Sequence, residues 1–158
     1  MIYLALYRGR KTIRRPYDLL ARASDWLTRV MTRGPYSHCE LVTHLGGGQY
    51  GCYSASVRDG GVRHKTMPLP ADKWDLIPIS SRESLAIDLQ AHYAATHGQA
   101  YDWPGALGFV LRTAHRPERW FCSEWAGHVL GLPDSWRFSP NDLAAIAKKG
   151  ERHGNQAV

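Results

Sequence analysis

The sequence has few cysteines and no long apolar segment. Its 158 residues include three cysteines, Cys39, Cys52 and Cys122, and this odd number excludes a complete disulfide framework. No apolar run approaches the roughly 18 residues that a membrane helix needs, so we expect no membrane span. The short apolar start of the chain precedes the basic residues within 8–15, whereas a secretory signal carries its charges first. We therefore expect synthesis in the cytoplasm without a cleavable export signal.

The length and composition are those of one globular domain. Of the 158 residues, 44% are hydrophobic and 22% are charged, which is typical of a folded protein rather than a disordered one. We expect a single domain over residues 1–150 and a flexible tail over residues 151–158. Twenty basic residues against 14 acidic ones give a net charge of +6. This charge favours contact with polyanions such as nucleic acid, anionic lipid or an anionic cell wall.

Hydrophobic periodicity and turn residues predict strands in the first half and helices in the second. The expected strands are 1–7, 37–44, 49–57, 62–67 and 74–79, with a tight hairpin turn at 58–61. The expected helices are 17–32, 81–97, one from 121 or 122 to 131, and one from 140 to about 149, with loops at 98–104 and 112–119. This distribution predicts an α+β fold, in which helices pack against an antiparallel sheet.

The first group of residues with chemical potential lies in the strand 37–44. Alternate residues of a strand share a face, so His38 and Glu40 point to the same side. Cys39 and Leu41 point to the other side. A histidine and a carboxylate on one face can act as a base and the group that orients it. The alternative is an edge strand with a solvated polar face, since histidine is often found on surfaces.

The second group surrounds Cys122, at the expected start of an apolar helix. Unpaired backbone N–H groups and the positive end of the helix dipole stabilise a thiolate there. The same N–H groups can stabilise an oxyanion. The alternative is a buried structural cysteine, because cysteine is among the most buried residue types. Trp103, Trp120 and Trp125 flank this group and either line a cleft or pack in the core.

Other sites have weaker support. A zinc site would need four side chains: His38, Cys39, Cys52 and His64. Because His38 and Cys39 are strand neighbours, they point to opposite faces, and the chain has no Cys-x-x-Cys spacing, so we do not expect a zinc site. The triple glycine at 46–48 lacks the Gly-Lys-Ser/Thr ending of a phosphate loop and indicates a hairpin turn. The basic stretch 8–15 is typical of a solvated segment, so we do not expect nucleic acid as a partner.

Taken in order, these motifs resemble the NlpC-type papain-like cysteine peptidase superfamily. The match is closest to its circularly permuted, YiiX-like branch, whose wider kin include lecithin retinol acyltransferase. In that branch the histidine strand comes first, as in residues 37–42, and the cysteine helix comes late, as in residues 121–125. The stretch 98–103 is similar to a tyrosine-containing stretch that lines the active site of the family. The resemblance spans residues 30–145 and implies a papain-like fold with its nucleophile at a helix N-terminus.

The resemblance also implies a mechanism without metal or cofactor. His38 would take the thiol proton of Cys122, and the thiolate would attack an amide or ester carbonyl to form an acyl-enzyme. The backbone N–H of Cys122, with the hydroxyl of Tyr101, would stabilise the oxyanion. Relatives often carry the third polar group on the strand after the histidine strand, where this chain has Ser54 rather than a carboxylate. We expect Glu40 to orient His38 instead, with Ser54 or a water molecule as the alternatives.

The same resemblance places four side chains at the oxyanion hole or substrate cleft: Tyr101, Ser54, Ser123 and Trp103. The leading hypothesis is a cysteine hydrolase that cleaves an amide bond in a peptidoglycan peptide, reached through lysis, a phage particle or a secretion machine. One alternative is a lipid acyl hydrolase or acyltransferase. Another is a catalytically silent, basic binding module. No residue pattern specifies an oligomeric state.

Overall fold

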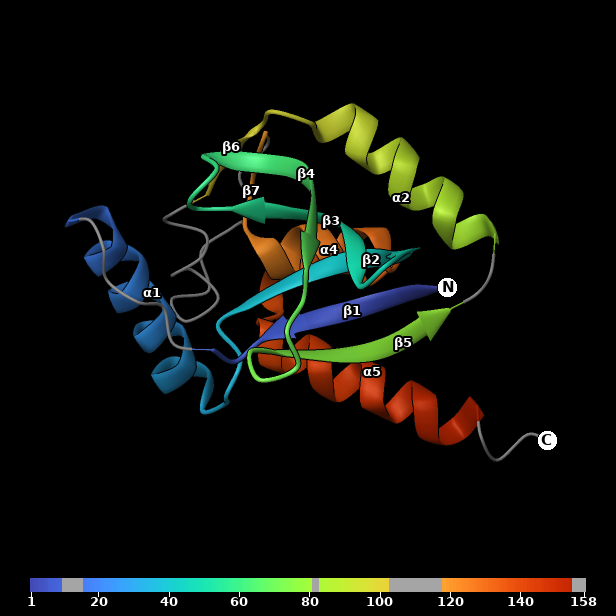
Figure 1. Cartoon of the computed structure of the whole chain (residues 1–158), viewed down its shortest axis with the longest axis horizontal. Coiled ribbons are helices and arrows are strands. Elements are labelled where there is room, and N and C mark those ends of the chain that lie inside the picture. Colours follow the sequence, from blue (N-terminus) through green and yellow to red (C-terminus); the bar gives the residue numbers. More distant parts are fainter. Residues whose placement is uncertain (10–15, 81–82, 103–117, 155–158) are drawn as a thin grey trace.

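The computed structural model describes residues 1–9, 16–80, 83–102 and 118–154 (Figure 1). Its strands are β1 (Ile2–Tyr7), β2 (His38–Gly46), β3 (Gln49–Ser56), β4 (Gly61–Pro68), β5 (Trp74–Ser80), β6 (Ala100–Tyr101) and β7 (Arg119–Trp120). Its helices are α1 (Pro16–Thr32), α2 (Glu83–Thr96), α4 (Cys122–Val129), the 3-10 helix η1 (Ser135–Arg137) and α5 (Pro140–Gly154). The expected α+β class is confirmed.

The strands form one curled, mixed sheet in the order β5-β1-β2-β3-β4-β6-β7. The expectation of an antiparallel sheet is correct for β1 to β6, but β6 and β7 pair in parallel. Both have only two residues, too few to show a periodicity: β6 lies within the expected loop 98–104, and β7 begins at the last residue of the expected loop 112–119. A parallel pair needs a long connection, and the chain between these strands, from residue 102 to 118, is long enough.

The helices α2, α4 and α5 cover one face of the sheet and enclose the larger hydrophobic core. In Figure 1, α4 and α5 lie behind the strands, with α4 packed on β2 and β3 and α5 on β1 and β5. Trp125 of α4 and Leu41 of β2 are both fully buried in this core. A smaller apolar cluster around Val42 and Cys52 covers part of the opposite face. The helix α4 therefore packs directly on β2 and β3, in the middle of the sheet.

Local signals set the start of α5. Ser139 caps the helix, because its hydroxyl accepts the N–H of Asp142 at 3.2 Å and the Asp142 carboxylate accepts the N–H of Ser139 at 2.8 Å. The helix begins at Pro140, the expected first helical residue. The expected end near Lys149 is wrong, since the helix continues to Gly154 and takes in the first residues of the expected tail. The rest of that tail, residues 155–158, lies outside the described residues.

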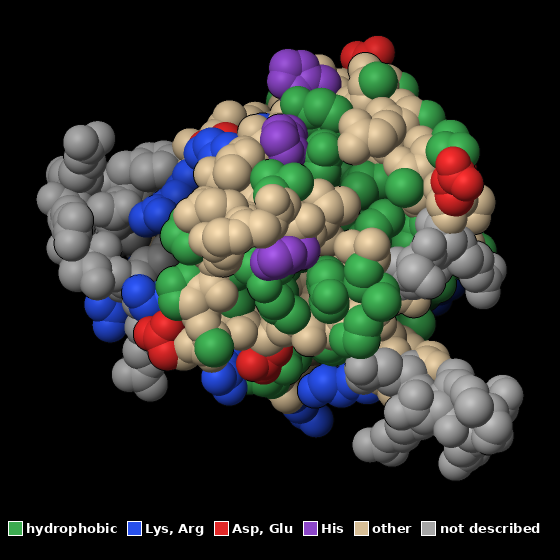
Figure 2. Space-filling view, turned by 45° about the vertical axis from the view of Figure 1, so that its right-hand side comes forward, with side chains coloured by type: hydrophobic (Ala, Val, Ile, Leu, Met, Phe, Trp, Pro, Cys, Tyr) green, Lys and Arg blue, Asp and Glu red, His purple; other side chains and the backbone are tan. Residues whose placement is uncertain are grey.

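None of the described helices is both long enough and apolar enough to cross a membrane. On the face of the molecule shown in Figure 2, basic side chains lie along the left and lower margins, and the centre carries mainly hydrophobic, uncharged and histidine side chains. The net charge of +6 is therefore not gathered into one patch on this face.

Candidate active site

Cys122 is the first residue of α4, where the chain changes from extended to helical. The residue before it, Phe121, has extended backbone angles (φ −106°, ψ 163°), and its N–H donates to the Glu124 carboxylate at 3.5 Å. At the other end, Gly131 takes a left-handed φ of 71°, which ends the helix near the expected position. Cys122 thus lies in the first turn, where backbone N–H groups and the helix dipole favour a negative charge.

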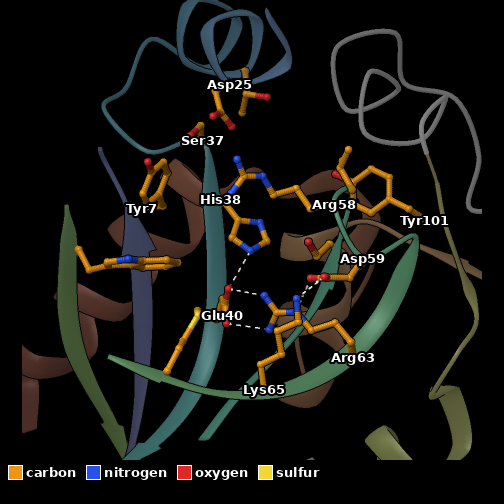
Figure 3. Close-up of a pocket in the computed structure, with 15 residues that line it drawn as sticks. Tyr7, Asp25, Ser37, His38, Glu40, Arg58, Asp59, Arg63, Lys65 and Tyr101 are labelled. Carbon is orange, nitrogen blue, oxygen red and sulfur yellow. Dashed lines mark hydrogen bonds and ion pairs between the residues drawn. The ribbon is translucent and has the colours of Figure 1, made fainter. Parts of the chain in front are cut away.

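His38 and Glu40 lie on the same face of β2 and contact each other. The Nε2 atom of His38 is 3.1 Å from Oε1 of Glu40 (Figure 3). The chain just before His38 is held by Ser37, whose N–H donates to the carbonyl of Tyr7 and whose hydroxyl accepts a hydrogen bond from Arg29. Because Nε2 faces Glu40, the Nδ1 atom is the ring nitrogen left for another partner.

His38 also interacts with the sulfur of Cys122, through a hydrogen bond and through the charge of its thiolate form. Burial on its own would lower the pKa of His38, but Cys122 and then Glu40 outweigh it and raise the pKa to about 9. The pKa of Cys122 lies well below its usual range, because a hydrogen bond from Cys39 and the charge of His38 outweigh the effect of burial. The fold therefore favours a thiolate beside an imidazolium at neutral pH.

Glu40 is a buried carboxylate, with 1% of its surface exposed. Burial would raise its pKa, but hydrogen bonds from His38 and Arg63 and their charges lower it to about 2. The guanidinium of Arg63 donates to both carboxylate oxygens, at 2.7 Å to Oε1 and 3.0 Å to Oε2. Glu40 is therefore ionised at neutral pH and can only accept hydrogen bonds, as the orienting group of a basic histidine must.

Cys39 belongs to the same site, although it points to the opposite face of β2 from His38. It is fully buried in the core under α4. Burial first, and then the hydrogen bond to Cys122, raises the pKa of Cys39 well above its usual range. Its thiol therefore stays protonated and donates to Cys122. The sequence analysis gave Cys39 no such role, because only the packing of α4 on β2 brings the two sulfur atoms together.

A cavity of about 280 Å³ opens beside this group. Its lining includes Tyr7, Asp25, His38, Glu40, Arg58 and Tyr101 (Figure 3). Tyr101 is 9% exposed, and burial, followed by the charge of Cys122, raises the pKa of its phenol well above the usual range. The phenol therefore remains a hydrogen-bond donor at the edge of the cavity. Cys122 is not among the described lining residues, so the cavity reaches its neighbours His38 and Tyr101 instead.

The remaining predicted cleft residues are placed differently. Ser54 is fully buried on β3, and its hydroxyl donates to the carbonyl of Cys39 at 2.8 Å rather than to the ring of His38. Ser123 is buried on α4, and within the described part of the chain its hydroxyl has no hydrogen-bond partner. Trp103 lies outside the described residues.

Trp120 and Trp125, which flank Cys122, are both buried in the larger core. The indole N–H of Trp125 donates to Thr96 on α2 at 2.9 Å, and that of Trp120 donates to Gln99 at 2.6 Å. Both side chains thus help to hold α4 and the residues just before it in place. Of the two open interpretations of these tryptophans, core packing is the correct one.

The sequence analysis missed the cations and the second carboxylate next to Glu40. Arg63 of β4 contacts Glu40, and its Nε donates to Asp59 at 2.9 Å; Asp59 also pairs with Lys65. A buried carboxylate needs a cation, but the sequence shows neither that Glu40 is buried nor which of the 20 basic residues pairs with it. Among the described residues, no group of three or more His, Cys, Asp or Glu side chains is arranged to hold a metal ion.

Comparisons with protein-family models, with curated proteins and with solved structures found no match to this chain.

Proposed function

We propose that this protein is a cysteine hydrolase of the NlpC-type, papain-like kind, with Cys122 as nucleophile, His38 as base and Glu40 as the group that orients His38. The observation that carries the proposal is the position of His38 between the Cys122 thiol and the Glu40 carboxylate. A nucleophile, a base and an orienter in contact form the arrangement that acyl transfer through a thiolate requires. The position of Cys122 in the first turn of α4 adds support.

The reaction follows from these contacts. The Cys122 thiolate attacks the carbonyl carbon of an amide, and the oxyanion that develops accepts a hydrogen bond from the backbone N–H of Cys122 and from the Tyr101 hydroxyl. His38, as imidazolium, protonates the leaving amine, which leaves an acyl-enzyme on Cys122. His38 then takes a proton from water, and the hydroxide releases the acid. Glu40 keeps the ring in one orientation throughout.

A peptide of the bacterial cell wall is the substrate class that we favour. The net charge of +6 suits an anionic polymer. The cavity beside His38 carries charges of both signs, with Asp25, Asp59, Arg58 and Lys65 in its lining. Such a lining suits a short peptide that bears both carboxylate and amino groups.

A lipid acyl substrate is the second candidate, and the surface of α1 favours it. Among the side chains of this helix that the structure describes, three large apolar ones are exposed: Trp26 (64%), Val30 (52%) and Met31 (40%). Trp26 and Val30 are four residues apart and share a face. The inner side of α1 carries Asp25 and Thr28, which line the cavity. An apolar outer face next to the cavity is compatible with an enzyme that works at a lipid surface.

The first test is the pH dependence of Cys122 alkylation by iodoacetamide. Mass spectrometry separates Cys122 from Cys39 and Cys52, and the shape of the profile, not its absolute rate, is compared. We expect Cys122 of the wild type to react well below pH 8. In His38→Ala the profile should move toward that of an ordinary thiol, whose pKa is about 8.5.

His64→Ala is the matched control, because His64 is exposed on β4 and its ring lies against that of Tyr53, with 4.3 Å between the ring centroids. It should keep the wild-type profile. If Cys122 reacts like an ordinary thiol, or is insensitive to the loss of His38, the hydrolase proposal fails and a silent binding module becomes the better interpretation. With an activated thiolate, assays on wall peptides and on lipid esters, with Cys122→Ala as the blank, decide between the two substrate classes.

A further inference from the structure

We propose that Arg63 is a positioning residue of this active site, which holds the Glu40 carboxylate against His38 and does not bind substrate. The inference rests on the proposed function, and it adds a residue that the resemblance does not supply. Arg63 lies on β4, whereas Glu40 lies on β2, so the contact bridges the intervening strand β3 (Figure 3). Only a long side chain that lies across the sheet can make it.

The register of the sheet explains how Arg63 reaches Glu40. Ser54 of β3 is directly opposite Arg63 of β4. On the other side, Leu41 of β2 is opposite Tyr53, which places Glu40 opposite Ser54. Opposite residues point to the same face, so these three side chains form a row with the smallest in the middle. The Ser54 hydroxyl is turned toward the carbonyl of Cys39, and this leaves the route above β3 open for the guanidinium.

The hydrogen bonds of Arg63 leave little of its guanidinium for a substrate. Nη2 and Nη1 donate to the two oxygens of Glu40, Nη1 also donates to the carbonyl of Cys52, and Nε donates to Asp59. These contacts use four of the five N–H groups that an arginine has. The side chain is 13% exposed, although it lies beside the cavity. Both ends of the guanidinium are thus tied to carboxylates, which fixes its plane and the plane of Glu40.

Removal of Arg63 should shift the pKa of His38 in one direction if Arg63 positions Glu40, and in the opposite direction if Arg63 acts only as a nearby charge. If Arg63 acted only as a cation, its removal would relieve repulsion on the imidazolium and raise the pKa of His38. If it holds Glu40 in place, its removal lets the carboxylate turn away or take up a proton. The pKa of His38 then falls. The direction of the change therefore separates the two roles.

The experiment titrates His38 by NMR of the histidine ring Cε1–H signals, with the His38 signal assigned by its absence in His38→Ala. In the wild type we expect a pKa near 9. In Arg63→Met it should fall by about one pH unit, as expected when a contacting carboxylate is displaced. Arg63→Lys keeps the charge but cannot form the bidentate contact with Glu40. The pKa of His38 in this variant should therefore lie between those of Arg63→Met and the wild type.

Ser54→Leu provides a second variant that changes no charge. Its larger side chain obstructs the route across β3, so it should lower the pKa of His38 like Arg63→Met, and it keeps the test valid if that variant does not fold. The matched control is Arg137→Met, which removes an exposed arginine of η1 that pairs with Asp134 just before this helix. Its His38 titration should match the wild type.

A His38 pKa that rises or stays constant in Arg63→Met overturns the proposal, and so does full restoration by Arg63→Lys. Failure of the proposed function gives a different result, because the wild-type His38 would then titrate near its ordinary value of 6.5. Far-UV circular dichroism of each variant shows whether it is folded before its titration is compared.

Discussion

The buried ion pair between Glu40 and Arg63 should appear as a strong energetic coupling in the free energy of unfolding. The perturbation is a double-mutant cycle of Glu40→Gln, Arg63→Met and the combined variant. Each single change leaves the other charge in a site from which water is largely excluded, since Glu40 is 1% and Arg63 13% exposed. The combined variant leaves neither charge behind. We therefore expect the effects of the single changes not to add.

The magnitude follows from the pKa of Glu40. Its fall from an ordinary value of 4.5 to about 2 in the folded protein corresponds to about 3 kcal/mol of stabilisation of the ionised form. Removal of one partner of a buried pair costs about 3–5 kcal/mol. We expect the lower end for each single variant, because Arg63 keeps Asp59 and Glu40 keeps His38. The double variant should lose about 3–4 kcal/mol, which gives a coupling energy of about 2–3 kcal/mol.

The assay is urea denaturation at pH 7, followed by tryptophan fluorescence, with the slope of the transition checked for constancy across the four proteins. The chain has six tryptophans, so the signal reports on unfolding of the whole domain. Single-variant losses that add to within about 0.5 kcal/mol would refute the reasoning, because independent sites behave in that way.

The same pair gives stability a defined pH dependence. Because the folded-state pKa of Glu40 is depressed to about 2, its contribution is complete above pH 4.5 and is lost as the pH falls through about 2. As the pH falls over this range, the free energy of unfolding of the wild type should therefore decrease by up to about 3 kcal/mol more than that of Glu40→Gln. Parallel stability curves for the two proteins would contradict the ion pair.

Two further changes test the neighbours of the nucleophile. Cys39→Ala removes the thiol that donates to Cys122, so the acid limb of the Cys122 alkylation profile should move to higher pH; an unchanged limb would show that the two thiols do not interact. Tyr101→Phe removes the proposed oxyanion donor, so kcat on a cleaved substrate should fall by about 10²-fold with little change in KM. A change in KM alone would place Tyr101 in substrate binding instead.

Features that depend on neighbouring residues could be predicted from the sequence. The start of α5 follows from the cap formed by Ser139 and Asp142, and the start of α4 lies at Cys122, within one residue of the prediction. The end of α5 was predicted too early, because Gly150 does not stop a helix in which Leu143 and Ala144 anchor the first turns to the core. The strands β6 and β7 could not be predicted, since their pairing depends on residues distant in the sequence.

By itself, the sequence determined that His38 and Glu40 share one face of a strand and that Cys122 begins a helix, because alternation and helix starts are local properties of the backbone. Only the tertiary structure decided that α4 packs on β2, which brings the thiol to His38. The register of three strands likewise decided which arginine neutralises Glu40. Register and helix packing are set by burial of apolar surface over the whole chain, so no short motif encodes them.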